Sequence, residues 1–188
     1  MTALPTSRQR ATLDDLMGVE GKAELIGGRI VRYMAAVFLP GKISTRILRR
    51  LADYAEAAGH GEALQSDVGY AVPTMPSGRQ SFSPDVSYHD GPLPANPMKF
   101  ISGAPTFAVE VRSENSYVPA QDLAIAAKRA DYFAAGTQVV WDVDPVNEWI
   151  DCYRASDPTN PVRFTRGQDA EAEPAVPGWR ISADWLFG

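Results

Sequence analysis

One central segment, residues 105–115, "PTFAVEVRSEN", is a strand-like apolar run with Glu110 between two valines and Arg112 directly after them. The odd-numbered positions are Phe107, Val109 and Val111, and the even-numbered positions are Ala108, Glu110 and Arg112. Because strand side chains alternate between faces, the pattern predicts a strand over residues 106–112 with one apolar face. A carboxylate inside such a strand needs a partner, since an unpaired buried charge is costly or protonates. For Glu110 that partner could be Arg112, a metal ion, or water at an open sheet edge.

Helical periodicity marks two longer segments. Residues 43–59 carry an apolar stripe and end at Gly59, a residue suited to a helix C-cap. Residues 121–135 predict a second helix that ends at Gly136. Its packed stripe is expected to consist of Leu123, Ala127, Ala130 and Ala134, with Ile125, Lys128 and Tyr132 on another face.

Shorter patterns complete the predicted fold. They indicate a helix at 12–19, a hairpin at 23–34 turning at Gly27-Gly28, strands at 62–72, 84–88, 138–144, 148–154 and 162–166, and a final helix at 182–187. Strand, helix and strand between residues 106 and 143 form a crossover unit, so part of the sheet should be parallel. The prediction is one α/β (mixed α+β) domain over residues 1–188, with a central mixed sheet flanked by helices and a loosely ordered segment at 1–11.

Composition narrows the class of protein. The net charge of −5 argues against a broadly basic nucleic-acid-binding surface, although a local basic groove is compatible with it. The single Cys152 excludes a disulfide framework and a cysteine-rich zinc site, and it fits a reducing cytoplasm. Since no apolar run approaches the ~20 residues of a membrane span, no membrane partner is expected.

Candidate chemistry gathers at two predicted strands and the helix that follows them. Asp85 begins a short strand, Glu110 lies inside the next, and Lys128 lies on the following helix. Magnesium or manganese prefers oxygen ligands, which Asp85, Glu110 and the Val111 carbonyl could supply from adjacent strands. A metal held there could activate water for phosphodiester hydrolysis, with a nearby cation orienting that water or binding phosphate.

Several stretches resemble the PD-(D/E)XK nuclease superfamily, and more narrowly its small bacterial Uma2 (DUF820-like) family of restriction-endonuclease-like proteins. The stretches are "PD" at 84–85, "VEVRS" at 109–113, "KRADYFAAGTQVVWDVDP" at 128–145, "AELIGGRIVRYM" at 23–34, and "PGWRIS" and "DWLF" near the end. The resemblance covers roughly residues 12–187. It implies a restriction-endonuclease-like fold, a magnesium-dependent deoxyribonuclease activity on DNA, and a two-fold homodimer.

The resemblance also implies roles for single residues. Asp85 and Glu110 resemble the two metal-binding acids of the family. Arg112 stands where the motif has its lysine, and Lys128 matches the lysine that many members carry on the next helix. Glu24 resembles an additional acid of the early hairpin and is a possible accessory residue.

Other interpretations of the same residues stay open. Glu110 could pair with Arg112, and Lys128 could pair with Asp131 or Asp122 at helical spacing. Arg79 and Lys99, in Pro/Gly-rich loops, read most simply as solvated cations, and Glu24 as structural. The competing function is a catalytically inactive member of the fold that serves as a dimeric interaction or nucleic-acid-binding module. Two surfaces are candidates for dimer contacts: the strand with Trp149 and Ile150, and the apolar segment around Phe38 and Leu39.

Overall fold

A six-stranded mixed sheet forms the centre of the computed structural model, which describes residues 10–188. The predicted loosely ordered segment at 1–11 therefore lies, for residues 1–9, outside the described residues. The strand order is β11(Asp157–Thr165), β10(Trp149–Arg154), β9(Val139–Asp144), β8(Phe107–Val111), β6(Val86–His89) and β3(Glu62–Gln65). Strands β8 and β9 are parallel and the other neighbours antiparallel, which confirms the predicted mixed sheet and its crossover.

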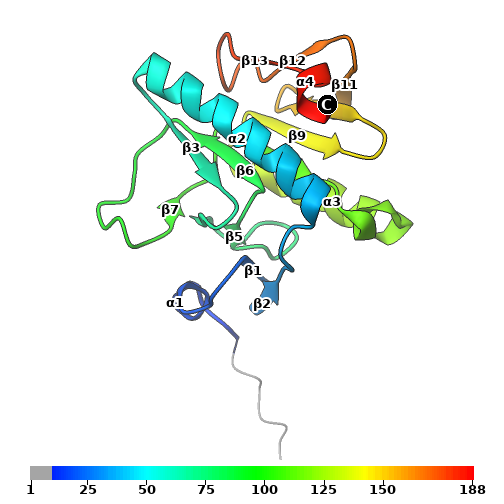
Figure 1. The fold of residues 1–188 in the computed structure, drawn as a ribbon. Coiled ribbons are helices and arrows are strands. Elements are labelled where there is room, and N and C mark those ends of the chain that lie inside the picture. The colour runs from blue at the N-terminus through cyan, green and yellow to red at the C-terminus, as the bar shows by residue number, and fades with distance from the viewer. Residues whose placement is uncertain (1–9) are drawn as a thin grey trace, which may run out of the picture.

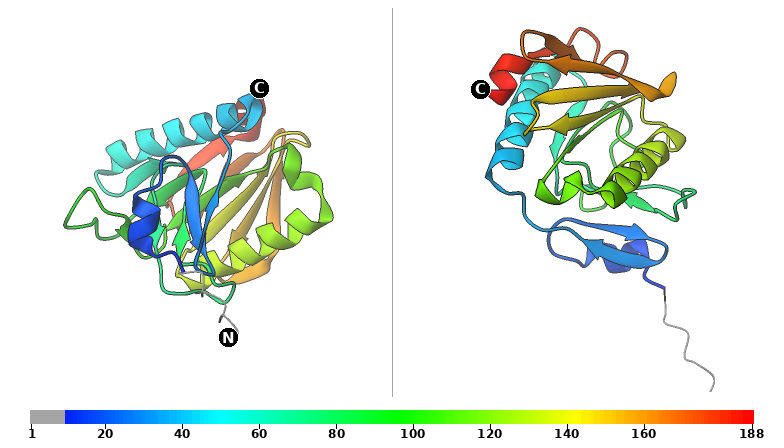
Figure 2. Two further views of the ribbon diagram at one scale, coloured as in Figure 1. Left: turned by 90° about the horizontal axis from the view of Figure 1, so that it is seen from below. Right: turned by 90° about the vertical axis from the view of Figure 1, so that its right-hand side faces the viewer.

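Two long helices cover opposite faces of this sheet (Figures 1 and 2). Helix α2(Phe38–Ala58) buries its Ile43, Ile47 and Leu51 stripe against the face that contains Phe107 and Val109. Helix α3(Pro119–Ala134) packs on the other face, where Tyr132 contacts a smaller apolar cluster with Ala108 and Val140. Alternate side chains of β8(Phe107–Val111) therefore belong to two hydrophobic clusters, one on each face of the sheet.

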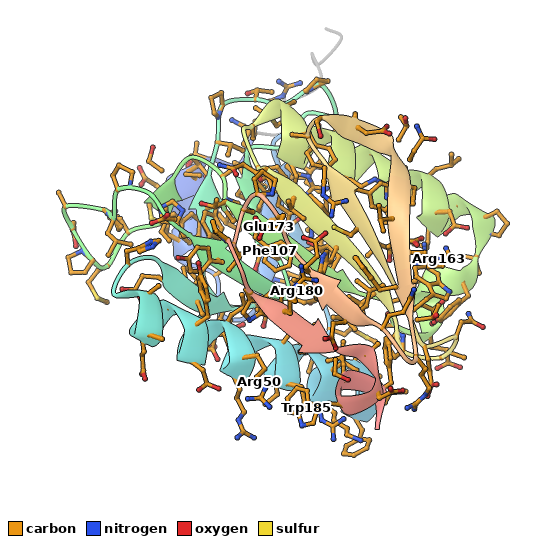
Figure 3. The ribbon with its side chains drawn as sticks, turned by 90° about the horizontal axis from the view of Figure 1, so that it is seen from above. Arg50, Phe107, Arg163, Glu173, Arg180 and Trp185 are labelled. Atoms are coloured by element: carbon orange, nitrogen blue, oxygen red, sulfur yellow. The ribbon has the colours of Figure 1, made fainter. Side chains whose placement is uncertain are left out.

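Smaller elements surround the sheet. They are α1(Leu13–Met17), the hairpin β1(Ala23–Ile26) and β2(Arg29–Arg32), a sheet of β4(Tyr70–Ala71), β5(Ser81–Phe82) and β7(Ile101–Ser102), the turn η1(Glu114–Tyr117), the pair β12(Asp169–Glu171) and β13(Arg180–Ser182), and α4(Ala183–Phe187). The hairpin and α1 lie together at one end of the molecule (Figure 2, right). At the opposite end Arg50 of α2 stacks 4.6 Å from the ring of Trp185 on α4 (Figure 3).

Local chemistry accounts for several element boundaries. Thr12 and Asp15 form a reciprocal capping box at the start of α1. Gly27 and Gly28 have φ angles of 60° and 74°, which the two-residue hairpin turn requires and which few other residues adopt. Gly59 ends α2 in the left-handed conformation, as predicted.

Three predicted elements differ from the structure by more than two residues, and one of them is β11, which begins at Asp157 rather than at residue 162. Helix α2 begins at Phe38 rather than at residue 43, because Pro40 lies in the first turn, where its missing N–H has no helical partner to lose. The strand predicted at 62–72 is two strands in two different sheets, since a turn after Gln65 separates β3 from β4.

Candidate active site

Asp85 and Val111 meet where the pairing of β6 with β8 ends. The Asp85 backbone N–H donates to the Val109 carbonyl at 3.0 Å, and its carboxylate Oδ2 accepts from the Val111 N–H at 2.7 Å. The side chain thus replaces the next backbone acceptor of the ladder. Because the N–H and C=O of one strand residue point to the same edge, the Val111 carbonyl is directed to the Asp85 side.

Glu110 points to the α3 face of the sheet, where helix α3 supplies its partners. Lys128 Nζ lies 2.7 Å from Glu110 Oε1, and the Tyr132 hydroxyl donates to the same oxygen at 2.7 Å. Among the described residues, the partner of the central carboxylate is therefore Lys128 and not Arg112.

Glu24 is a fully buried acceptor that also binds Lys128. Its Oε1 lies 3.0 Å from Lys128 Nζ and accepts from the Ser83 N–H at 3.0 Å. Its Oε2 accepts from the Tyr33 hydroxyl at 2.8 Å and from Arg79. Four donors therefore satisfy this carboxylate, as burial requires.

The pKa values of Glu110 and Glu24, the two acids that contact Lys128, are shifted in opposite directions. Burial raises the pKa of Glu110; Lys128 lowers it, and Asp85 nearby raises it again, so the net shift is upward. Burial also opposes ionisation of Glu24, but the charges of Lys128 and Arg79 outweigh it and lower that pKa. Burial disfavours the ammonium of Lys128, yet Glu110 and Glu24 raise its pKa above the ordinary range, so it stays protonated at neutral pH.

Lys22 pairs with Asp85. Its Nζ lies 2.6 Å from Asp85 Oδ1. The residue directly precedes β1, and its carbonyl accepts from the Tyr33 N–H at 3.0 Å, so it extends the hairpin ladder. Strand alternation then places Lys22 and Glu24 on the same face of the hairpin.

Arg112 lies outside this cluster of partners. Its guanidinium donates twice to Asp142 on β9, at 2.8 Å each, and once to Asp122 on α3 at 3.0 Å. These contacts hold the end of β8 to β9 and to the start of α3. They also occupy Asp122, while Asp131 pairs with Arg79 and not with Lys128.

The face of α3 that packs inward is not the one predicted. The expected packed stripe, Leu123, Ala127, Ala130 and Ala134, is exposed, whereas Asp131 and Tyr132 are buried. Glu110, Glu24 and Arg79 lie beneath the helix and pair with its polar side chains, while the Tyr132 ring stacks on Phe82 at a centroid distance of 4.1 Å. The charged residues opposite α3 therefore determine its buried face better than its stripe of small apolar side chains does.

Sequence reasoning missed three participants, Lys22, Tyr33 and Arg79, and it placed Tyr132 on the face of Lys128 without giving it a role. The hairpin contains a usable signal, because a turn at residues 27–28 pairs Lys22 with Tyr33 and alternation aligns Lys22 with Glu24. Arg79, read as a solvated loop cation, is buried with Glu24 and Asp131, and nothing near it in the sequence indicates this. The solvated reading of Lys99 agrees with its half-exposed side chain.

The donor set can be tested against the implied metal. Within residues 10–188 no three acidic, histidine or cysteine side chains converge as a metal-binding group. Two carboxylates and one carbonyl, all hard oxygen donors, nevertheless match the way magnesium is held, with water and substrate oxygens completing its coordination. Asp85 and Glu110, each about one quarter exposed, are open enough to exchange a partner.

Comparison with known proteins identifies the family. Residues 11–184 match the profile of Uma2, described as "Putative restriction endonuclease". The chain belongs to the Uma2 family. This confirms the resemblance inferred from the motifs. No curated protein matches the sequence.

A solved structure supports the same fold. A crystal structure described as "a putative nuclease belonging to DUF820 from Anabaena variabilis" aligns with a TM-score of 0.75 and 18% identity, covering 94% of this chain and 97% of that chain. At this identity the likeness shows the fold, and the restriction-endonuclease-like fold predicted from the sequence is confirmed. In the described residues of this Uma2 member, no helix is long and apolar enough to cross a membrane.

Proposed function

We propose that this Uma2 protein is a metal-dependent endonuclease that hydrolyses phosphodiester bonds of DNA. One observation carries the proposal: Asp85 and Glu110 lie at the end of the pairing between β6 and β8, where Asp85 accepts from the Val111 N–H and Lys128 contacts Glu110. Oxygen donors beside a fixed cation are what phosphodiester hydrolysis uses. Family membership supports the same class of reaction.

Asp85, Glu110 and Val111 would hold Mg²⁺ or Mn²⁺. The bound ion would lower the pKa of a water molecule and neutralise charge on the phosphate. Asp85 is suited to this task because Val111 fixes its Oδ2, and Glu110 is suited because its two donors both reach Oε1. Each carboxylate is thus held in orientation by protein contacts.

Lys128 would orient the nucleophile or stabilise developing negative charge. It cannot serve as a general base at neutral pH, since its two carboxylate partners keep it protonated. Glu24 acts through Lys128 and is a positioning residue, because its four donors leave it a poor metal ligand. Arg112 has a structural role in this proposal, given its bonds to Asp142 and Asp122.

The test is a cleavage screen with Mg²⁺ and Mn²⁺ on single-stranded, duplex and branched DNA and on RNA. Cleavage of DNA by the natural protein should be lost in Asp85→Asn and Glu110→Gln, which keep the shape of each side chain and remove its charge. Glu56→Gln is the matched control, because Glu56 is exposed on α2 across the sheet. Manganese titration by calorimetry should show a site that the first two variants lose and the control keeps.

A protein that binds DNA and cleaves none of these substrates with either metal would refute the enzyme and favour the inactive interaction or nucleic-acid-binding module. Cleavage of RNA alone would refute DNA as the substrate. Cleavage that survives both carboxylate variants would place the chemistry elsewhere.

We also infer a homodimer. Of the two candidate surfaces, the one at β10 offers little apolar area, because Ile150 is buried and Arg163 stacks 4.1 Å from the Trp149 ring. The segment before and into α2 is the better candidate, since Met34 is 80% exposed and Phe38 83% exposed.

A further inference from the structure

The contact between Lys22 and Asp85 is short and largely shielded. Nζ and Oδ1 are 2.6 Å apart, with 16% of the lysine side chain and 25% of the aspartate side chain exposed. The Lys22 ammonium also lies 5.7 Å from the centre of the Tyr33 ring, which favours a cation there. The lysine is therefore seated by two neighbours rather than extended into solvent.

Lys22 binds Oδ1 of Asp85, the carboxylate oxygen that is not bound to the Val111 N–H. Oδ2 is bound to the Val111 N–H, so it completes the strand ladder, whereas Oδ1 receives only the ammonium among the described residues. Oδ1 is thus the oxygen available to an incoming cation, and Lys22 already occupies it.

The charges around the site are close to balanced without a metal ion. Four carboxylates, those of Glu24, Asp85, Glu110 and Asp131, contact three cations, those of Lys22, Arg79 and Lys128. The sum of these seven charges is −1. Lys128 and Arg79 each contact two of the carboxylates, whereas Lys22 contacts one, so its release breaks the fewest of these ion pairs.

We propose that Lys22 is a built-in competitor for the metal position: its ammonium holds Asp85 in the metal-free protein and must leave for a divalent cation to bind. This inference rests on the proposed metal site. It makes metal affinity weaker than the oxygen donors alone would give, because each binding event also breaks an ion pair. The released ammonium then lies beside the site as a cation that phosphate can bind.

The test compares manganese affinity in the natural protein, Lys22→Met and Lys22→Arg by calorimetry. Lys22→Met keeps an unbranched side chain that is one atom shorter and removes the competing charge, so it should bind Mn²⁺ about tenfold more tightly. Lys22→Arg keeps the charge and should bind no more tightly than the natural protein. Lys99→Met is the control, because Lys99 is half exposed and lies 4.0 Å from an exposed Asp14.

Thermal melting in chelator provides a second readout. Without metal, Lys22→Met should melt at a lower temperature than the natural protein, since Asp85 loses its cation, and saturating Mn²⁺ should restore it. Cleavage measured at saturating metal should fall in the same variant. Tighter metal binding together with slower cleavage is a result that a purely structural ion pair does not give.

The outcomes separate this inference from the proposed function. Equal Mn²⁺ affinity in the natural protein and Lys22→Met would overturn the competition and leave the metal site standing. Mn²⁺ binding by Lys22→Met alone would support the competition strongly. Absence of Mn²⁺ binding in every variant would overturn the metal site and the competition together.

Discussion

Glu24 and Glu110 both contact Lys128, and their environments shift their pKa values in opposite directions. The pKa of Glu110 is raised, chiefly by burial, and that of Glu24 is lowered by Lys128 and Arg79. A raised folded pKa contributes stability that is complete below the unfolded value and is lost as pH rises through the folded value. A lowered pKa contributes stability above the unfolded value, which is lost as pH falls through the folded value.

Replacing each acid by its amide should therefore have opposite effects. Glu110→Gln should raise the melting temperature at pH 7, and the gain should vanish as the pH falls below the pKa of glutamate in the unfolded chain. Glu24→Gln should lower it at pH 7, with a smaller loss at acid pH. Calorimetric melts from pH 4 to pH 8 measure both, and parallel pH profiles for the two variants would contradict the assignment.

Lys128→Met should cost stability as well as cleavage. It leaves Glu24 and Glu110 facing each other without their shared cation, which should lower the free energy of unfolding at pH 7 by roughly 3 kcal/mol. Urea denaturation measures the loss. Adding Glu110→Gln should recover part of the stability but none of the cleavage, whereas an active Lys128→Met protein would remove Lys128 from the chemistry.

At the level of elements, Arg112 connects three of them. Its guanidinium binds Asp142 of β9 through two parallel bonds and Asp122 of α3 through a third, while its backbone belongs to the end of β8. Lysine cannot reproduce this fork, because its ammonium is a single point of charge. Arg112→Lys is therefore not a conservative change here.

Arg112→Lys should lower the free energy of unfolding by about 1–2 kcal/mol and leave manganese affinity unchanged. Arg29→Lys, at an exposed position of β2, is the control and should be neutral. A double-mutant cycle with Asp142→Asn should show coupling between the two residues. Loss of metal binding in Arg112→Lys, with stability intact, would return Arg112 to the site.

Elements were predictable where the determinants are local. Alternation identified β8, the glycine pair identified the hairpin turn, and Ser182 identified the start of α4, because each depends on residues a few positions apart. The inward face of α3 depends on Glu24 and Arg79, which lie far away in sequence. No pattern within the helix contains that information.

The site was predictable to the same extent. Asp85, Glu110, Val111 and Lys128 were named from motif spacing, and the structure brings them together. Arg112 was placed with them because it stands where the motif has its lysine, but a position in a motif does not fix the partner of a side chain, and Arg112 binds Asp142 and Asp122 instead. The hairpin pattern aligns Lys22 with Glu24, but its contact with Asp85 depends on tertiary packing, as does the contact of Arg79 with Glu24, and neighbouring residues encode neither contact.

At the scale of the whole molecule, an exposed apolar segment leads from the β1–β2 hairpin into α2. Met34, Val37 and Phe38 are 80%, 56% and 83% exposed. The segment continues from Tyr33, which binds Glu24, so it adjoins the candidate site. A two-fold contact through it would bring two sites near one another on a duplex.

Phe38→Glu should convert a dimer into monomers. The variant would bury an unpaired carboxylate at the contact and would also lose the apolar area of Phe38, and both changes weaken association. Sedimentation at tens of micromolar should therefore show the monomer mass. Leu123→Glu, at a 74% exposed position on α3, is the matched control and should stay dimeric. A natural protein that sediments as a monomer at this concentration would refute the dimer itself.

The bond from the Val111 amide to Asp85 has a spectroscopic consequence. Most amides of β8 donate to a neighbouring strand, but this proton points at a carboxylate whose other oxygen is held by a lysine. Its nuclear magnetic resonance signal therefore responds to whatever cation shares Asp85. In a ¹⁵N-labelled sample, the Val111 amide resonance would report the exchange of the Lys22 ammonium for a metal ion at Asp85 without any substrate.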